Sequence, residues 1–266
     1  MAEGRDKMVG AIKFDGVKKS FTTLEGETVI ALGGVDLEIE KGSFVCLIGP
    51  SGCGKSTMLR LLAGLDTPTE GAVYLGDKKV TRPDHDRGLV FQDPNLFPWL
   101  NIYDNISFGL KVRKLFKERK NDVNEFIELV GLKGFEKSFP HQLSGGMCQR
   151  ASLARALIGH PEALLLDEPL GALDAFTRMN MQDELLRIKK EKEMTMIMVT
   201  HDVDEAVYLA DKIVVMTPRP AKIEKVIDVH LSQPRDRNNP EFIRLRSEIL
   251  KILDFAGKER EIEYNI

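Results

Sequence analysis

Cysteine is scarce in this sequence, with three residues in 266. Cys46, Cys53 and Cys148 show neither C-x-x-C nor metal-ligand spacing, and an odd number argues against a disulfide framework. The pattern predicts reduced thiols, as in a cytosolic protein. We expect Cys46 to be a small core residue and Cys53 to be a bystander. No motif pairs a cysteine with a base, which argues against a catalytic thiol.

Long apolar runs are also missing. No stretch approaches the ~18 residues that a membrane-spanning helix needs, and residues 1–7 lack the apolar centre of a secretory signal. We therefore expect a soluble chain whose membrane role, if any, is exercised through partners. The formal net charge of −3 creates no basic field, which disfavours nucleic acid as a partner.

The apolar content of 42% is enough for a substantial core, in one large domain or in a domain with a subdomain. The N-terminal part is rich in β-formers and alternating patterns, punctuated by Gly26 and Gly33-Gly34. These patterns predict strands over residues 11–14, 29–32, 35–39 and 43–48, the last a continuous apolar run typical of a buried strand.

Strands and helices alternate in the C-terminal half. The pattern predicts strands over 163–166, 194–199 and 212–216, separated by helices over 176–190 and 203–210. Such alternation indicates an α/β protein with a mostly parallel sheet covered on both faces. Between the two halves, residues 94–158 are predicted to be helical. The basic run 111–120 within this segment is interpreted as a solvated helix or loop face.

A glycine-rich loop follows the buried strand 43–48 and precedes a predicted helix. In such a loop the backbone N–H groups curl around phosphates, and the helix N-terminus adds a positive end. Lys55 is expected to reach the β- and γ-phosphates of ATP, and Ser56 to ligate Mg²⁺. The predicted nucleotide-binding residues of this loop are Gly49, Pro50, Ser51, Gly52, Cys53, Gly54, Lys55, Ser56 and Thr57.

Further polar residues follow predicted strands. Asp167 and Glu168 end the apolar strand 163–166, and His201 closes the strand 194–199. Ligands of open α/β sheets bind at the carboxyl ends of strands. We expect Asp167 to hold Mg²⁺, Glu168 to polarise the attacking water, and His201 to contact the γ-phosphate or the water.

Leu143-Ser144-Gly145-Gly146 precedes a predicted helix over 147–158 and forms a second helix N-terminus suited to an anion. One nucleotide does not need two such sites far apart in the sequence. Gln92 follows Val90-Phe91, a position where an amide can touch Mg²⁺ or water, although a glutamine in such a place is more often without a role.

Together these motifs resemble the ABC-type ATPases over about residues 12–216. The resemblance implies a P-loop fold with an N-terminal antiparallel β subdomain and an inserted helical subdomain. It also implies that two cassettes pack head to tail, so that Leu143, Ser144, Gly145, Gly146 and Gln149 contact the ATP held by the partner. By the same resemblance, Phe21 stacks on adenine, Gln92 contacts Mg²⁺ and reports phosphate occupancy, Asp174 lies in a loop that crosses the dimer, and His201 acts as a switch.

One position departs from the family pattern. Cys148 stands where the family usually carries a basic or polar residue, while Gln149 and Arg150 are retained. Contact with ATP should therefore survive. Whether the lost charge weakens dimer closure or coupling stays open.

A narrower resemblance links residues 95–101 and the tail from Thr217 to the ATPases of nitrate, sulfonate, taurine and bicarbonate importers. It implies that Trp99 lies where family members grip a membrane subunit. The alternative for Pro98-Trp99 is an ordinary buried turn. We expect an ABC ATPase domain over 1–218, with the helical subdomain at about 94–158. A C-terminal extension over 219–266 is expected to end in an amphipathic helix, with Phe242, Leu245, Ile249, Ile252 and Leu253 on its packing face.

These resemblances predict the ATP-hydrolysing subunit of an importer for a small anionic solute. It would act as a homodimer at the cytoplasmic face of the membrane, with two permease subunits and a solute-binding protein. A DNA-repair ABC ATPase would need a long coiled coil, and sustained heptads are missing. A translation-type ATPase usually carries two cassettes. A P-loop kinase would not need the LSGG stretch, and a degenerate cassette would not need Glu168 and His201.

Overall fold

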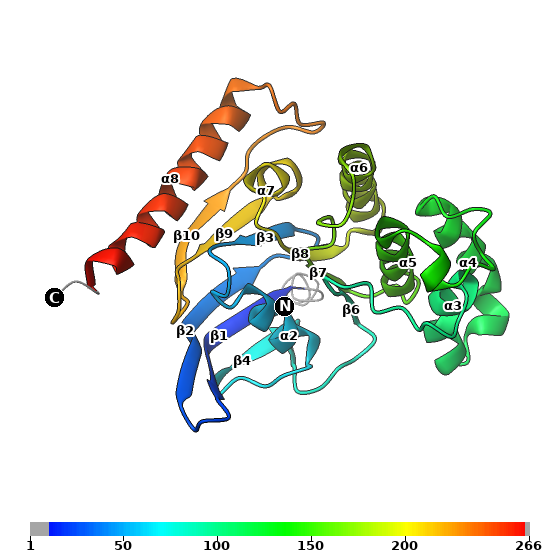
Figure 1. Cartoon of the computed structure of the whole chain (residues 1–266), viewed down its shortest axis with the longest axis horizontal. Helices are drawn as coiled ribbons and strands as arrows, with labels where there is room; N and C mark the ends of the chain where they lie inside the picture. Colours follow the sequence, from blue (N-terminus) through cyan, green and yellow to red (C-terminus); the bar gives the residue numbers. More distant parts are fainter. Residues whose placement is uncertain (1–10, 264–266) are drawn as a thin grey trace, which may run out of the picture. The chain divides into compact units, whose positions relative to one another are not determined.

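The computed structural model describes residues 11–263, with side chains up to residue 254. The segment 1–7, on which the expectation about a secretory signal was based, lies outside the described residues. The chain forms two compact units (Figure 1). Unit 1 comprises Met1–Pro83 and Lys189–Ile266, and unit 2 comprises Asp84–Ile188.

Unit 1 contains a four-stranded antiparallel sheet in the order β2-β1-β4-β5. Its strands are β1 (Ile12–Thr22), β2 (Thr28–Ile39), β4 (Glu70–Leu75) and β5 (Lys78–Lys79). The prediction of two strands over 29–32 and 35–39 is wrong, because β2 continues through Gly33-Gly34. The pairing of β1 with β2 shifts register beside these glycines, as a strand does when glycine permits a bulge.

The second sheet region of unit 1 has β3 between two parallel neighbours, β8 and β9. The strands are β3 (Phe44–Ile48), β8 (Thr195–Val199) and β9 (Lys212–Met216). All five residues of β3 are buried, as its apolar run predicts. Helix α2 (Lys55–Ala63) follows β3, and α7 (Val203–Leu209) connects β8 to β9. The mostly parallel core predicted for this region is confirmed.

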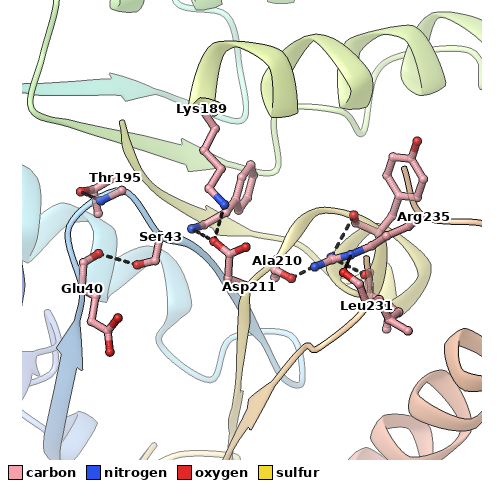
Figure 2. Close-up of polar contacts among 12 residues, drawn as sticks. Glu40, Ser43, Lys189, Thr195, Ala210, Asp211, Leu231 and Arg235 are labelled. Atoms are coloured by element: carbon pink, nitrogen blue, oxygen red, sulfur yellow. Dashed lines mark hydrogen bonds and ion pairs between the residues drawn. The ribbon is translucent and has the colours of Figure 1, made fainter. Parts of the chain in front are cut away.

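Asp211 holds the start of this parallel region together. Its Oδ2 accepts from the Phe44 backbone N–H at 2.7 Å. The same oxygen accepts from Lys189 Nζ at 2.5 Å, and Figure 2 shows Lys189 reaching Asp211. The carboxylate therefore joins the beginning of β3 to the end of α6 (Ala175–Lys192). A charged acceptor makes each of these hydrogen bonds stronger than a neutral one would.

Unit 2 combines two parallel strands with a cluster of helices. The strands are β6 (Arg87–Val90) and β7 (Ala163–Asp167), and the helices are α3 (Ile102–Val112), α4 (Phe116–Leu129) and α5 (Gly145–Leu157), with a short 3-10 turn at Pro140–Gln142. The helices lie within the range predicted to be helical and share a fully buried core around Ile106, Leu110 and Val123. The basic run falls at the junction of α3 and α4, where most side chains are exposed.

The C-terminal segment contains one strand that the sequence pattern did not predict, β10 (Ile223–Asp228), antiparallel to β9. It is followed by the predicted helix, α8 (Pro240–Glu263), whose first turn is capped by Asn239 Oδ1 accepting from the Glu241 N–H at 2.8 Å. The predicted packing face is buried at Phe242, Leu245 and Ile249. Within residues 11–263, none of the helices has the length and apolarity to cross a bilayer.

Gly64 ends helix α2 in a left-handed conformation, with φ of 75°. A Cβ there would lie 2.3 Å from the backbone carbon and oxygen of Arg82. We predict that Gly64→Ala lowers the free energy of unfolding by about 2–4 kcal/mol, from strained φ plus overpacking. Gly26→Ala, at φ of 86° with open space, is the control and should cost only about 1 kcal/mol. Urea unfolding measures both, and equal losses would contradict the steric account.

Candidate functional site

The loop between β3 and α2 curls around the ammonium group of Lys55. Lys55 Nζ donates to the carbonyl oxygens of Gly49 at 2.8 Å and Pro50 at 2.9 Å, and the residue is only 7% exposed. Gly52 and Gly54 have φ of 72° and 108°. The N-terminus of α2 receives no side-chain cap. A loop of this shape at a helix N-terminus suits a phosphate group.

Phe21 lies in β1 of the same unit and is 43% exposed. Lys19 Nζ stands 4.8 Å from the centre of that ring and also binds Asp66 Oδ1 at 2.6 Å. The ammonium group is therefore fixed over the ring by an ion pair that is largely shielded from solvent. An exposed aromatic ring held in this way is suited to stacking against a planar base.

His201 follows β8, the strand that runs parallel beside β3. The phosphate loop and His201 therefore leave the carboxyl ends of neighbouring parallel strands, at the same edge of the sheet. The residues on either side of His201 are held in place. Thr200 Oγ1 donates to Glu205 Oε2 at 2.7 Å, and Asp202 Oδ1 accepts from the N–H of Asp204 at 2.8 Å as the cap of α7.

In unit 2, Asp167 ends β7 and Glu168 follows it. Glu168 has a φ of 47°, an uncommon conformation for a residue other than glycine and one that is often found at functional sites. Gln92 comes after the neighbouring parallel strand β6, and its Nε2 donates to Glu168 Oε2 at 3.3 Å. The structure therefore brings together two of the residues predicted from the sequence.

The Ser144-Gly145-Gly146 stretch forms the start of α5. Ser144 is the N-cap, and its Oγ accepts from the Met147 N–H at 3.2 Å. A Cβ on Gly145 would meet nothing within 4 Å, whereas one on Gly146 would lie 3.0 Å from Leu173 Cδ2. Gly145 therefore leaves the helix N-terminus open, and Gly146 permits close packing against the segment that leads to Asp174.

Asp174 precedes α6, and its Oδ1 accepts from the Thr177 N–H at 3.0 Å. Hydrogen bonds from Thr177 lower the pKa of the Asp174 carboxyl group. The residue therefore keeps its negative charge to lower pH than an ordinary aspartate, because those donors favour the ionised form.

Gln149 differs from the expectation that it contacts ATP with the rest of the stretch. It is 3% exposed, and its Nε2 donates to the carbonyl oxygen of Phe91 at 3.1 Å. Helix α5 buries this side chain because position 149 faces the interior of unit 2. Gln149 thus holds the backbone next to Gln92 and joins the start of α5 to the Gln92–Glu168 pair.

The three cysteines behave as small side chains. Cys46 is fully buried in β3, and burial raises the pKa of its thiol. The Sγ of Cys53 lies 3.8 Å from Lys55 Nζ. Cys148 is half-buried, its Sγ donates to the Pro140 carbonyl at 3.4 Å, and burial raises its pKa too. A raised pKa keeps the Cys46 and Cys148 thiols neutral and unreactive.

Trp99 lies just before α3 and is 70% exposed, so the alternative of a buried turn is wrong. Its ring stands 5.6 Å from that of Phe97, which in turn lies 4.6 Å from the ring of Phe108. The Arg155 guanidinium is 5.6 Å from the centre of the Phe97 ring. These aromatic side chains form a partly exposed surface of unit 2, which is the kind of patch that marks contact with another protein.

Two contacts of the site were not foreseen from the sequence. Arg219 donates through Nε to the Gly52 carbonyl of the phosphate loop. Glu205, buried at the start of α7, holds Thr200 beside His201. Neither residue belongs to a local pattern with a phosphate or metal meaning. The only available signal was that both lie close in sequence to a predicted strand end.

The phosphate loop, the acids at the end of β7 and the glycines that follow the Ser144 cap of α5 define the class of an ATP-binding cassette. Residues 32–171 match the family model described as ABC transporter. This chain belongs to the ABC transporter family. Within that family, it is 46% identical over 248 residues to the aliphatic sulfonates import ATP-binding protein SsuB of Bacillus subtilis (strain 168), covering 93% of this chain and 95% of that protein.

Two further comparisons extend this result. The chain is 48% identical over 259 residues to the bicarbonate transport ATP-binding protein CmpC of Synechococcus elongatus, covering 94% of this chain and 39% of that protein. Among solved structures, it resembles the dimeric post-hydrolysis state of the ATP-binding cassette MJ0796 bound to ADP and Pi. The TM-score is 0.75 and the identity 34%, covering 83% of this chain and all of that one. The expected P-loop ABC fold is confirmed.

Loss of the hydrogen bond from Gln149 to Phe91 should slow ATP hydrolysis. Gln149→Met keeps the volume of the side chain but removes its N–H donor, so the segment carrying Gln92 should lose its fixed position. We expect the maximal rate of ATP hydrolysis to fall about tenfold, with nucleotide affinity nearly unchanged, because misplacing a group of the site raises the activation barrier. A tenfold loss of rate corresponds to a barrier raised by about 1.4 kcal/mol.

The control is Gln182→Met, a second buried glutamine of unit 2 on α6. Steady-state kinetics of both variants give the comparison. Unchanged turnover in Gln149→Met, or an equal loss in Gln182→Met, would contradict the role of Gln149.

Proposed function

We propose that this chain is the ATP-hydrolysing subunit of an importer for a small anionic solute of the nitrate, sulfonate, taurine or bicarbonate type. The names of the relatives support this proposal, because SsuB is named for import of aliphatic sulfonates and CmpC for transport of bicarbonate. The observation that carries the ATPase assignment is the contact of Gln92 with Glu168 directly after β7.

ATP is the proposed substrate. Lys55, with the backbone N–H groups of the phosphate loop and the hydroxyl of Thr57, would bind the phosphates, and Phe21 would stack on the adenine. The buried ammonium group of Lys55 already lies among oxygen acceptors, and phosphate oxygens offer the same kind of partner. Positioning and charge stabilisation, rather than covalent chemistry, account for most of the catalysis of phosphoryl transfer.

Mg²⁺ is the implied cofactor. Ser56, Gln92 and Asp167 would hold it, and all three offer oxygen ligands, which suit Mg²⁺. Among the described residues, no three His, Cys, Asp or Glu side chains gather in a way that could hold a metal ion. Mg²⁺ in phosphate-binding sites is usually held by one or two carboxylates together with phosphate oxygens and water. When bound, the ion neutralises part of the phosphate charge.

Glu168 would orient and polarise the water that attacks the γ-phosphorus, and the products are ADP and phosphate. Gln92 holds the Glu168 carboxylate at 3.3 Å and could sense the γ-phosphate through the same amide. His201, set between the fixed residues Thr200 and Asp202, would donate a hydrogen bond to the γ-phosphate or accept one from the water.

We also propose that the chain works as a homodimer. In this arrangement, Leu143, Ser144, Gly145 and Gly146 of one copy face the ATP bound to the phosphate loop of the other, and the segment with Asp174 crosses between the copies. The open N-terminus at Gly145 supports the first part. Two similar solved structures of the cassette MJ0796 are dimeric, which supports the homodimer itself.

Trp99 and its neighbouring aromatic rings form the proposed contact with the membrane subunits. Two integral permease subunits would each receive one copy of this surface, and a separate solute-binding protein would deliver the solute. The chain would thus sit at the cytoplasmic face of the membrane as a peripheral subunit. We further propose an ATPase domain over 1–218, including a helical subdomain over about 94–158, followed by a C-terminal extension.

Glu168→Gln tests the proposed catalysis. The amide cannot polarise water as the carboxylate does, so hydrolysis should fall at least a hundredfold, while ATP still binds and holds two copies together. Size-exclusion chromatography with MgATP should show a stable dimer. Glu125→Gln, an exposed acid on α4, is the control and should behave as the wild type. Turnover close to wild type in Glu168→Gln would refute the assignment.

Trp99→Ala tests the proposed contact with the permease subunits. Removing a large exposed ring at an interface typically costs about 2 kcal/mol or more of binding free energy. The variant should therefore keep its fold and its ATP affinity but lose most of its copurification with the permease subunits. Ile243→Ala, on the exposed side of α8, is the control. Equal recovery of the complex with both variants would remove the argument.

A further inference from the structure

The C-terminal segment after β9 contacts the elements that carry the nucleotide site of unit 1 at two separate places. Arg219 touches the phosphate loop, and Arg235 touches the end of α7. The first contact reaches Gly52, and the second reaches helix α7, which begins at Val203, two residues after His201. The following inference rests on the proposed ATPase function.

The turn that carries Arg219 is fixed to the antiparallel sheet of unit 1. The N–H of Ala221 donates to the Ala31 carbonyl at 3.0 Å, and the N–H of Gly33 donates to the Ala221 carbonyl at 2.9 Å. Thr217 closes the turn with its own backbone N–H to the Lys222 carbonyl at 3.0 Å. Arg219 is therefore presented from an ordered backbone rather than from a free loop.

The Arg219 guanidinium lies against the phosphate loop. Its Nε donates to the Gly52 carbonyl, and a Cβ placed on Gly52 would be 3.1 Å from its Nη2. The contact fixes the carbonyl oxygen of Gly52 and brings a second positive charge next to the loop, besides Lys55. Both effects favour a loop that receives phosphate, because the guanidinium adds positive potential and the fixed backbone reduces the entropy lost on binding.

Arg235 is only 7% exposed. Its Nη1 donates to the carbonyl oxygens of Val207 at 2.8 Å, Tyr208 at 3.0 Å and Ala210 at 2.7 Å. Figure 2 shows the guanidinium reaching the backbone at Ala210. The last carbonyl groups of a helix lack internal partners and form its negative end, so a buried cation there completes the helix. Burial lowers the pKa of Arg235, and nearby Asp211 raises it.

The C-terminal segment holds α7 at further points. The Arg237 guanidinium lies 3.8 Å from the centre of the Tyr208 ring, and Arg246 Nε donates to Asp204 Oδ2 at 2.9 Å. Asp204 lies in the first turn of α7, next to the cap Asp202. Both ends of a seven-residue helix are thus held, and the loop with His201 is attached to its N-terminal end.

We propose that the C-terminal segment is a working part of the ATP site, in which Arg219 positions the phosphate loop and Arg235 positions His201 through helix α7. Neither arginine is placed on the reacting atoms. Arg219 acts on nucleotide binding, because its contact is with the loop that receives the phosphates. Arg235 acts on the rate of hydrolysis, because the helix it completes orients the switch histidine.

The two effects can be separated in the full-length chain. Arg219→Ala should weaken MgADP binding about five- to tenfold, measured by calorimetry, because a hydrogen bond from a charged group and its potential at the loop are lost. Arg235→Ala should leave MgADP affinity within twofold of the wild type and lower kcat about tenfold. Lys225→Ala, which breaks only the Lys225–Glu248 ion pair between β10 and α8, should change neither quantity.

A double variant tests whether Arg235 acts through His201. If it does, adding Arg235→Ala to His201→Ala should not lower the residual ATPase rate further. Val17→Ala, in the buried face of β1, controls for a general loss of stability and should retain kcat well below its melting temperature. Hydrogen exchange should become faster in α7 of Arg235→Ala and stay unchanged in β1.

The inference is overturned if Arg219→Ala binds MgADP as the wild type does, if Arg235→Ala retains its kcat, or if Arg235→Ala lowers the residual rate of His201→Ala tenfold. In each of these cases an active wild type would leave the proposed ATPase function standing. A wild type that binds MgADP but does not hydrolyse ATP would refute the proposed function. The MgADP affinities and the hydrogen exchange of α7 would then still decide the positioning roles.

Discussion

A buried ammonium group needs oxygen partners, and this requirement shapes the loop between β3 and α2. Lys55 is almost fully buried, and the carbonyls of Gly49 and Pro50 receive its protons. The cost of removing such a charge from water is met only if its hydrogen bonds are made. The loop must therefore curl, which explains the left-handed backbone at Gly52 and Gly54. The same curl points the backbone N–H groups inward, where a phosphate can accept from them.

The N-terminus of α5 is shaped by a capping serine and small residues rather than by a buried charge. Ser144 caps it, Gly145 leaves it open, and Gly146 lets it pack closely against Leu173. Gln149, one turn further along the helix, then reaches the backbone beside Gln92. A displacement of α5 would be passed to the segment with Gln92 through this hydrogen bond. In the proposed dimer, a partner's ATP at Ser144 would act on hydrolysis through this connection.

The sequence predicted the parts of the fold whose signal is local. The strand β3 was found because buried parallel strands are continuously apolar. The strand β10 was missed because its exposed, charged residues alternate with few apolar ones. The two predicted strands around Gly33-Gly34 proved to be one, since glycine inside a strand looks like a turn in the sequence but can be accommodated by a bulge.

In the candidate site, too, local signals could be predicted from the sequence and long-range contacts could not. Its motifs could be recognised because the phosphate loop, the Asp167-Glu168 pair and the glycines after Ser144 are contiguous. Contacts between distant residues could not be recognised. Gln149 lies 58 residues from Phe91, and Arg235 lies 28 from Val207, so no spacing rule relates them. The roles of the buried Gln149 amide and the buried Arg235 guanidinium become visible only when the fold places backbone carbonyls within hydrogen-bond distance of them.

In the proposed homodimer, Lys55 and Ser144 contribute to the same ATP site only when two copies of the chain meet. The most direct test is the ATPase rate per molecule of the purified chain, measured from nanomolar to tens of micromolar protein in saturating MgATP. The account predicts a rate per molecule that rises with concentration and then levels off as dimers form. A constant rate per molecule over this range, in a protein that remains monomeric throughout, would contradict it.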